Sequence, residues 1–506
     1  MNKQMKVFFI VFLLIAHSVN LYAQKSNYIW TFGDSAGINF NNLSNPLPIT
    51  SSMDSRGSCA SISDSLGNLL FYAGINYYGI GFSTNVYNSL HQQMPNGDSL
   101  KGVAWYNELI ILPMPSSPNK YYLFTLDVNI NLGLYYSIID MGLNNGLGDI
   151  ILKNQQINST YWAGTIKAIK HANGRDWWLF IRTAANNFDD KYYRYFVSPN
   201  GIDSMPAQQI GTGSQTGFVE FKWNKQGDRM AMVNYVGLIE LYDFDRCTGL
   251  LSNPVTIRQP VMVSPAPALW SCEFSNSGDL LYISASPIIP DSSRLIQVDL
   301  RNYPNNITMD TLWATYFPKV TAGALKRGPD DKIYFSCAYV PPAFNNYPYA
   351  DSMYNYFNMN LGVINSPDSL GLECDFQPWS FYLNGKRTYW GLPNNPDYDM
   401  GPVVGSICDS LSTGFASITN TKGVINKVFP NPNNGAFYIE LNQTFAAPVR
   451  AELYDIQGKL CAWQLIDNTH YTTPLRFEQV TAGIYTLKLN SNKINLGTVK
   501  VVVNYR

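Results

Sequence analysis

Residues 33–37, Gly-Asp-Ser-Ala-Gly, place a serine between two glycines at the spacing of a nucleophile elbow. In that motif the serine hydroxyl attacks an acyl carbon, assisted by a histidine and a carboxylate. Asp467 and His470 supply those two residue types far downstream, in a D-x-x-H arrangement. The chemistry that these residues could perform is ester hydrolysis.

The stretch Phe32-Gly33-Asp34-Ser35 also resembles the opening block of the GDSL esterases, whose serine lies near the mature N-terminus. That resemblance implies a parallel sheet with crossover helices. The flanking residues "IWTF" and "INFNN" instead predict a strand on each side of Ser35, and the esterases' G-x-N-D block is absent. We therefore interpret Gly33 and Gly37 as turn residues, with Asp34 and Ser35 capping the turn, and assign no catalytic residue.

The N-terminus has the layout of a secretory signal peptide. Lys3 and Lys6 precede an apolar run over residues 7–16, which is too short to span a bilayer. The sequence predicts a signal peptide over residues 1–23 with cleavage between Ala23 and Gln24; a buried N-terminal helix or a membrane anchor is the alternative. No later apolar stretch is long enough for a transmembrane helix, so none is expected after signal removal.

The composition excludes two classes of partner. Charged residues make up 14% of the 506 residues and the formal net charge is −1, so no electrostatic footprint for nucleic acid or anionic membrane is present. Abundant aromatic, Asn, Gly and Pro residues favour strands and turns. Seven cysteines leave two interpretations open: buried free thiols, or disulfides such as Cys374 with Cys408 and Cys247 with Cys272.

A strand, a turn and an apolar aromatic strand recur along the chain at a nearly constant period. The strands after the turns, such as residues 177–180 and 280–283, are apolar on both faces, as a sheet packed between two others requires. A period near 50 residues is typical of a β-propeller with four strands per blade. The turns fall at Gly67, Asn119, Gly174, Gly227, Gly278, Asp331 and Gly385, at intervals of 52, 55, 53, 51, 53 and 54 residues.

These repeats predict an all-β chain with a seven-bladed β-propeller over residues 24–403. A strand at residues 28–32 is expected to close the ring by pairing with the last blade, which would hide the free edges. The alternative is a pair of β-sandwiches whose turns are evenly spaced by chance.

The character of the chain changes near residue 404. Residues 404–424 are rich in Ser, Thr and Gly and are predicted to be a linker. Residues 425–506 contain alternating strands separated by turns, which suits a small antiparallel β-sandwich.

This last segment resembles the type A C-terminal sorting domain of the type IX secretion system of Bacteroidetes. The resemblance implies that the secretion machinery recognises residues 425–506, carries the protein to the secreted or outer-cell-surface location, and removes this domain. The Asn504-Tyr505-Arg506 tail extends past the usual ending, and a passive binding sandwich is the alternative. The residues that carry the resemblance are Pro430, Asn431, Pro432, Gly435, Asp455, Gly458, Lys459, Gly483, Ile484, Tyr485 and Lys500.

The front domain looks like the propeller at the N-terminus of large secreted proteins of the same bacteria, through "IWTFGDSAGINFNN", "GSCASISDSLGNLLFYA", "GLPNN" and "NPDYDM". The PKD-type repeats that often follow in those proteins are not seen in this sequence. The resemblance supplies no catalytic activity that can be carried to named residues.

Two classes of function remain open for the propeller: a binding module for a glycan or protein ligand, or an extracellular enzyme such as a polysaccharide lyase or glycosidase. The tryptophans that could contact a ligand are Trp162, Trp177, Trp178, Trp270, Trp313 and Trp390, although most are expected in the core. The carboxylates that could serve an enzyme are Asp243, Asp245, Asp330, Asp331, Asp397 and Asp399, although turn roles are commoner. With only His91, His171 and His470 after signal removal, no transition-metal site and no cofactor are expected, and calcium stays open.

Overall fold

The structure is a computed structural model of the chain that divides into two compact units, Met1–Asp409 and Ser410–Arg506, described separately below. The predicted signal peptide, Ala23 included, and most of the predicted linker lie outside the described residues. No helix among the described residues is long and apolar enough to cross a membrane. The structure describes residues 24–55, 57–76, 83–102, 106–128, 132–160, 162–183, 191–213, 218–261, 268–286, 292–317, 320–339, 354–409, 425–441, 444–445, 448–455, 459–466, 470–477, 480–491 and 494–504.

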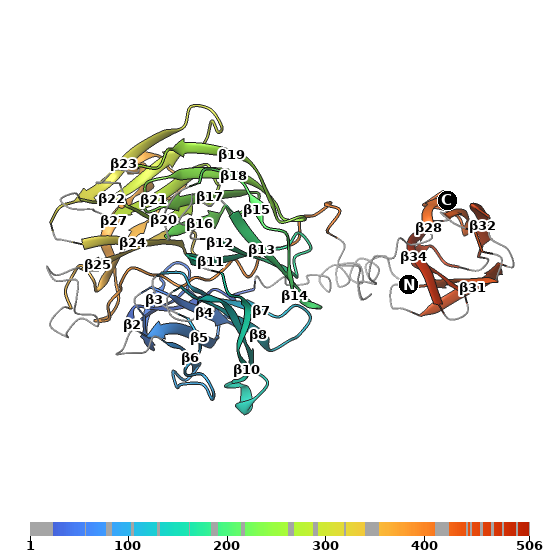
Figure 1. Cartoon of the computed structure of the whole chain (residues 1–506), viewed down its shortest axis with the longest axis horizontal. Coiled ribbons are helices and arrows are strands. Elements are labelled where there is room, and N and C mark those ends of the chain that lie inside the picture. The colour runs from blue at the N-terminus through green and yellow to red at the C-terminus, as the bar shows by residue number, and fades with distance from the viewer. Residues whose placement is uncertain are drawn as a thin grey trace, which may run out of the picture. The chain divides into compact units, whose positions relative to one another are not determined.

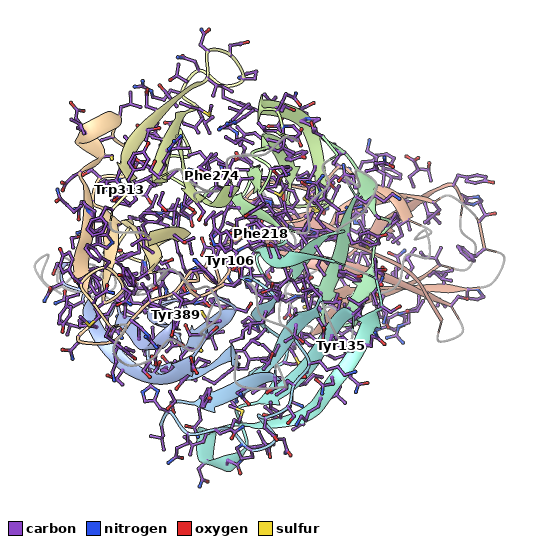
Figure 2. The ribbon with its side chains drawn as sticks, turned by 60° about the vertical axis from the view of Figure 1, so that its left-hand side comes forward. Tyr106, Tyr135, Phe218, Phe274, Trp313 and Tyr389 are labelled. Carbon is purple, nitrogen blue, oxygen red and sulfur yellow. A yellow bond between two sulfur atoms is a disulfide. The ribbon has the colours of Figure 1, made fainter. Side chains whose placement is uncertain are left out.

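The first unit is a seven-bladed β-propeller. Its seven antiparallel sheets follow one another around a centre near which Tyr106 and Phe218 lie (Figures 1 and 2). The first strand of each sheet is the innermost, and successive first strands contact one another from β1 to β24 around the ring. This arrangement lines the central channel with the side chains of the first strands.

The strands of the seven sheets are, in chain order, β1 (Ile29–Phe32), β2 (Asp34–Asn39) and β3 (Leu47–Asp54); β4 (Cys59–Ser63), β5 (Leu69–Asn76) and β6 (Ser83–Asn88); β7 (Leu109–Pro113), β8 (Lys120–Asp127), β9 (Gly133–Asp140) and β10 (Asp149–Asn158); β11 (Trp162–Lys170), β12 (Trp177–Thr183), β13 (Lys191–Ser198) and β14 (Gly201–Ser204), with β15 (Gln208–Gln209) also on β13; β16 (Val219–Trp223), β17 (Arg229–Asn234), β18 (Ile239–Asp245) and β19 (Leu250–Arg258); β20 (Ala268–Phe274), β21 (Leu280–Ser286), β22 (Ser293–Asp299) and β23 (Thr308–Thr315); β24 (Val320–Arg327), β25 (Ile333–Tyr339), β26 (Asn360–Ile364) and β27 (Phe376–Tyr382). Within the described residues, the 3-10 helices η1 (Asn144–Gly146) and η3 (Gly371–Cys374) lie between strands.

Six of the seven predicted turns lie between the first and second strands of their blades, as the period requires. Each places a residue in the left-handed region, which Gly, Asn and Asp tolerate best. The φ angles are 88° at Gly67, 65° at Asn119, 73° at Gly174, 74° at Gly227, 82° at Gly278 and 62° at Asp331.

The second strands are buried on both faces, as their apolar sequences predict. Trp177 packs in the core between the third and fourth blades, whereas its neighbour Trp178 packs in the core between the fourth and fifth. Leu281 and Tyr282 are divided in the same way between the two faces of the sixth blade. Each blade is therefore held by apolar contact with two neighbours.

The closure of the ring differs from the sequence prediction. Gly385 follows β27, the fourth strand of its sheet, and does not form a hairpin within a seventh repeat. Among the described strands β1 pairs only with β2, across a tight turn at Gly33, and not with the last blade. Closing such a short loop costs little conformational entropy, so β1, β2 and β3 form a blade of their own.

Side-chain packing closes the ring in place of strand pairing. The aromatic ring of Tyr334, in β25, lies with its centroid 5.7 Å from that of Trp30 and 5.5 Å from that of Phe40, both in edge-to-face geometry. An isolated bridge and a salt bridge of 3.0 Å join Asp34 to Arg387 beside this contact. The first and last sheets are thereby fastened without a shared ladder.

A segment that we call the crossing segment, residues 386–403, follows β27 and runs past the first strands of several blades. The Trp390 carbonyl accepts a hydrogen bond from Ala324 N in β24 at 2.7 Å. Asn394 N donates to the Cys59 carbonyl in β4 at 2.7 Å, and Tyr398 Oη donates to the Ile111 carbonyl in β7 at 3.0 Å. The segment thus contacts first strands that are far apart in sequence.

The crossing segment also changes the expected cysteine pairing. Cys408, just after it, forms a disulfide with Cys247, with the two Cα atoms 5.7 Å apart. Cys272 and Cys374 are buried free thiols in separate cores, so both pairings considered from the sequence are wrong. Sequence spacing could not show that the segment returns to the fifth blade.

The second unit is a small antiparallel β-sandwich, as predicted. One sheet has the order β28-β29-β32 and the other β31-β30-β33-β34, and Ile439, Leu453 and Leu487 pack between them. The strands are β28 (Ile425–Phe429), β29 (Ala436–Leu441), β30 (Val449–Tyr454), β31 (Leu460–Ile466), β32 (Thr472–Arg476), β33 (Gly483–Ser491) and β34 (Ile494–Val503).

Candidate functional site

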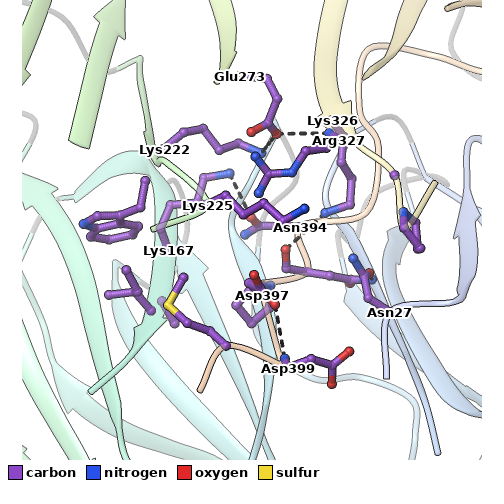
Figure 3. Close-up of a pocket in the computed structure, with 18 of the residues that line it drawn as sticks. Asn27, Lys167, Lys222, Lys225, Glu273, Lys326, Arg327, Asn394, Asp397 and Asp399 are labelled. Carbon is purple, nitrogen blue, oxygen red and sulfur yellow. Dashed lines mark hydrogen bonds and ion pairs between the residues drawn. The ribbon is translucent and has the colours of Figure 1, made fainter. Parts of the chain in front are cut away.

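A cavity of about 420 Å³ lies in the propeller where the first strands end. Its wall comes from β11, β16, β20, β24, the crossing segment and the N-terminal residues 24, 27 and 28. Lys225 and Asp331, on two of the strand turns, are exposed and lie at its edge. Figure 3 shows the labelled cations in the upper part of this cavity and Asp397 and Asp399 in the lower part.

Charged side chains from four first strands meet in this cavity. Lys167 comes from β11, Lys222 from β16, Glu273 from β20 and Lys326 from β24. Side chains of a strand alternate between its two faces, so each charge points into the channel while its neighbours pack between blades. The site therefore rests on rigid strands of the ring.

Two ion pairs join adjacent blades, the first buried and the second partly buried. Lys167 Nζ lies 2.9 Å from Glu220 Oε1, and Lys222 Nζ lies 3.3 Å from Glu273 Oε2. Burial lowers the pKa of Lys167 to about 8, and the nearby Glu220 opposes that shift. Burial also works against the charged form of Lys222, but Glu273 and Glu220 outweigh it and raise the pKa of Lys222.

Lys326 is the most isolated cation of the site. Its side chain is buried, with the residue only 5% exposed, and its Nζ donates to the Asn395 carbonyl at 3.1 Å. Within the described part of the chain, Lys326 forms no ion pair with a carboxylate. Burial, reinforced by Lys222, holds the pKa of Lys326 well below its usual range. Arg327 lies beside it, and its Nη1 has no hydrogen-bond partner among the described residues.

Asn394 of the crossing segment fixes the position of Lys167. Its Oδ1 accepts a hydrogen bond from Lys167 Nζ at 2.8 Å. Its Nδ2 donates to the carbonyls of Leu109 at 2.9 Å and Ile166 at 2.8 Å, on two neighbouring first strands. A buried amide with donors and acceptor all engaged holds the floor of the cavity in one arrangement.

Two carboxylates of the crossing segment face a different set of cations. Burial raises the pKa of Asp399 to about 6, although a hydrogen bond from Ser26 opposes that shift. Burial lowers the pKa of Lys170 to about 8, and attraction by Asp399 and Asp397 counteracts it. The acidic part of the cavity is thus balanced by Lys170 rather than by Lys326.

The structure brings some of the aspartates considered from the sequence into the cavity and gives the others local roles. Asp331, Asp397 and Asp399 line it. Asp243 accepts a hydrogen bond from Asn253, Asp245 caps the turn at residues 247–248, and Asp330 accepts from Tyr334. No group of three or more metal-ligating side chains is found among the described residues.

Of the tryptophans considered from the sequence, none whose side chain is described lines the cavity. Trp223, which was not considered, does. Trp177 and Trp178 are core residues, Trp313 packs against aromatic rings near β27, and the side chain of Trp162 lies outside the described set. Trp270 and Trp390 join Tyr106 and Phe218 in an aromatic cluster, with Phe218 and Trp270 stacked at 4.4 Å.

The serine of the opening stretch lies in a strand beside a turn. Ser35, at φ 60°, is the second residue of β2, which begins at Asp34 directly after the Gly33 turn, and its Oγ donates to Asp34 Oδ1 at 3.4 Å. His91 contacts Tyr72 Oη, and His171 contacts the Cys247 carbonyl; no histidine ring in the described residues is bonded to Ser35. Gly37 was predicted in the turn but lies within β2, where a Cβ would come 2.5 Å from the Trp30 carbonyl.

The residues of the proposed sorting motif tie the strand ends of the second unit together. Asn431, between Pro430 and Pro432, accepts a hydrogen bond from Val502 N at 2.7 Å and donates to the Lys500 carbonyl at 3.0 Å. Gly435 has φ 92° in the turn before β29. Asp455 Oδ1 accepts from Lys459 N, Gly483 and Ile484 begin β33, Tyr485 Oη donates to the Thr481 carbonyl, and Gly458 lies outside the described residues.

Sequence reasoning missed the basic residues of the cavity, although a signal was present. Lys222, Glu273 and Lys326 each precede the turn residue of their blade by five positions, at 227, 278 and 331. Charges at one position of an otherwise apolar repeat indicate a shared lining of the channel.

Comparison with known families identifies the tail. Residues 427–504 match the secretion system C-terminal sorting domain, so the chain carries a type IX sorting domain and is secreted or held at the outer cell surface. No curated protein matches the chain.

Solved structures similar to the chain include a candidate 6-phosphogluconolactonase of Bacteroides fragilis. Its sequence is 10% identical to this chain, the alignment covers 73% of this chain and 96% of that protein's chain, and the TM-score is 0.45. A periplasmic gluconolactonase of Pseudomonas aeruginosa has 10% identity, coverage of 73% and 98%, and a TM-score of 0.43. Similarity at this level assigns no function to the chain.

Proposed function

We propose that this protein is exported by the type IX secretion system and that its propeller is a binding module, with the channel cavity as the ligand site. The observation that carries the proposal is the cavity itself. Its volume of about 420 Å³ falls within the range of about 300–1,000 Å³ usual for small-ligand sites. Its wall is built on first strands that packing and buried ion pairs hold in place.

A glycan is the ligand class that this wall suits best. The side-chain amide of Gln24 and the Nδ2 group of Asn27 offer hydrogen-bonding groups to sugar hydroxyls, and the rings of Tyr28 and Trp223 offer apolar surface. The amides of Asn224 and Asn395 are engaged within the protein and help to fix the wall. A protein ligand could reach the cavity only through one side chain or a chain end. We therefore propose that the end of an extracellular glycan enters the cavity.

Binding is tested with the full chain on a glycan array, followed by calorimetry with the strongest ligands. Tyr28→Ala removes a ring of the cavity wall whose hydroxyl has no hydrogen-bond partner among the described residues, so binding should fall while the fold persists. Tyr316→Ala, which removes an exposed ring outside the cavity, is the matched control. If a ligand bound Tyr28→Ala with the same affinity as Tyr316→Ala, the cavity would be excluded as the binding site.

The export half of the proposal needs a separate test. Deleting residues 425–506 should leave the protein inside a host that has the type IX machinery, because the sorting domain is what that machinery recognises. Unchanged appearance of the truncated chain in the medium would contradict this half alone.

A second candidate function is extracellular hydrolysis or elimination of a polysaccharide. Asp399, whose pKa burial raises to about 6, lies in the cavity beside Asp397, and a protonated acid next to a second carboxylate suits general acid and base roles. Release of new reducing or unsaturated ends from a bound glycan, lost in Asp399→Asn, would favour the enzyme over the binding module.

A further inference from the structure

We propose that the ligand of the cavity is an acidic saccharide, whose carboxylate or sulfate group is bound by Lys326 and Arg327. This inference rests on the proposed function and names the class of its ligand. Neither the sorting domain nor the solved structures similar to the chain point to it.

The first observation is an excess of positive charge on one side of the cavity. Lys167, Lys222, Lys326 and Arg327 lie there, and two carboxylates, those of Glu220 and Glu273, accompany them. Lys167 is paired with Glu220 and Lys222 with Glu273, so within the described residues the side chains of Lys326 and Arg327 have no carboxylate partner of their own. An anionic ligand would supply the missing charge.

The second observation is the burial of Lys326. A buried ammonium group is costly unless it is paired, and the Asn395 carbonyl is its one hydrogen-bond acceptor among the described residues. The Trp30 ring, 5.2 Å away, adds a cation–π contact that carries no negative charge. An anion bound beside Lys326 would offset the burial that lowers the pKa of this amine, so the group would be protonated as the acidic ligand binds and would donate to it.

The acidic part of the cavity does not fill this role. Asp399 and Asp397 act on Lys170, and Asp397 acts on Arg246. Figure 3 shows Lys326 in the upper part of the cavity and Asp397 and Asp399 in the lower part. A ligand with one acidic end would therefore be oriented, with its anion at Lys326 and its neutral part toward Asp397 and Asp399.

The size of the cavity argues against a bare inorganic ion as its ligand. One water molecule takes about 30 Å³ of liquid, so about 420 Å³ would hold a small ion and leave most of the space to water. A uronic acid or sulfated sugar carries an anionic group of the same kind and would fill the remaining space with its hydroxyl groups, to which Gln24 and Asn27 of the wall can bond.

The test is calorimetry on the full chain with three oligosaccharides of equal length and linkage: neutral, uronate-bearing and sulfated, with inorganic sulfate as a fourth probe. A hydrogen bond to a charged group contributes about 1.5–3 kcal/mol, so an acidic oligosaccharide should bind about 10- to 150-fold tighter than the neutral one. The uronate and sulfate arms distinguish the two sources of the anion.

Two variants locate the effect. Lys326→Met keeps the length of the side chain and removes its charge, so the preference for acidic ligands should disappear while the neutral ligand still binds. Lys120→Met, which removes a partly exposed lysine of β8 that is paired with Asp140, is the control and should keep the preference. If Lys326→Met does not fold, Arg327→Gln should lower the preference, and added salt should weaken the acidic ligands alone.

The outcomes separate this inference from the proposed function. If neutral and acidic ligands bound with equal affinity and Tyr28→Ala still lost binding, the proposal of an acidic ligand would be wrong and the proposal of a binding module would stand. Binding of sulfate ion without any oligosaccharide would overturn the saccharide. Failure of every probe to bind would overturn both.

Discussion

Replacing Trp30 by alanine tests how the ring is closed. Trp30 is fully buried in β1, and its ring packs against Phe40 at 4.8 Å and Tyr334 at 5.7 Å between centroids. Its Nε1 also donates to the Asn27 carbonyl at 3.1 Å. The variant therefore removes the central contact between the first and last sheets and leaves the strand ladders intact.

The expected loss of stability follows from the buried area. A large aromatic side chain buries about 150–250 Å², which corresponds to about 4–6 kcal/mol at about 25 cal/mol per Å². Truncations of buried aromatic residues cost about 3–5 kcal/mol in practice. We expect a decrease of about 4 kcal/mol in the free energy of unfolding of the propeller. Phe317→Ala, which truncates a ring that is 88% exposed, should change it by less than about 0.5 kcal/mol.

The assay is urea unfolding followed by circular dichroism and by tryptophan fluorescence. A single cooperative transition with a lower midpoint and an unchanged slope is the expected result. A loss below about 1 kcal/mol would show that the contact between the first and last sheets does not hold the ring. Separate transitions for the two probes would refute the idea that the seven blades unfold as one unit.

Three further predictions concern the ion pairs, the pH dependence and processing. Lys167→Met should cost about 3–5 kcal/mol because it leaves the Glu220 carboxylate buried without its cation, and Glu220→Gln introduced into that variant should recover part of the loss in a double-mutant cycle of urea unfolding. The folded-state pKa values of Lys167 and Lys170 are about 8 and lie below the unfolded value of about 10.4, so the unfolded chain binds more protons than the folded chain above pH 8. The free energy of unfolding should therefore rise between about pH 8 and 9.5. Lys170→Met should reduce the slope of that rise. Mass spectrometry of the exported protein should find an N-terminus at Gln24 and lack most of residues 425–506; intact tail peptides in the medium would contradict processing.

Much of the fold could be predicted because its turns require particular residues. Gly227 and Gly278 occupy left-handed turns that side chains with a Cβ rarely adopt, so the repeat is visible in one sequence. The number of blades could be predicted from that period, but the residues at which the first and last blades begin and end could not. The N-terminal blade begins with a turn at Gly33 that falls outside the regular spacing, and Gly385 has a suitable φ of 76° without a hairpin to close.

The cavity was harder to predict because its parts come from distant positions. Lys326 is a charged residue in an apolar strand, and only the ring places it near Lys222 of another blade. The contribution of Asn394 depends on the course of residues 386–403, which have no regular secondary structure and so no periodic pattern. Composition shows that the chain carries few charges, but not that several of them meet in the channel.

The crossing segment has a consequence for how the propeller folds. Asn394 bonds to Leu109, 285 positions earlier, and Asn395 bonds to Ser61, 334 positions earlier. Such contacts form only after the whole chain up to the crossing segment is available, and a fold dominated by distant contacts forms slowly. The last residues of the propeller to be synthesised thus form hydrogen bonds with some of the first. A chain that stops before residue 386 would contain the strands of every blade but would lack the segment that joins β4, β7 and β24.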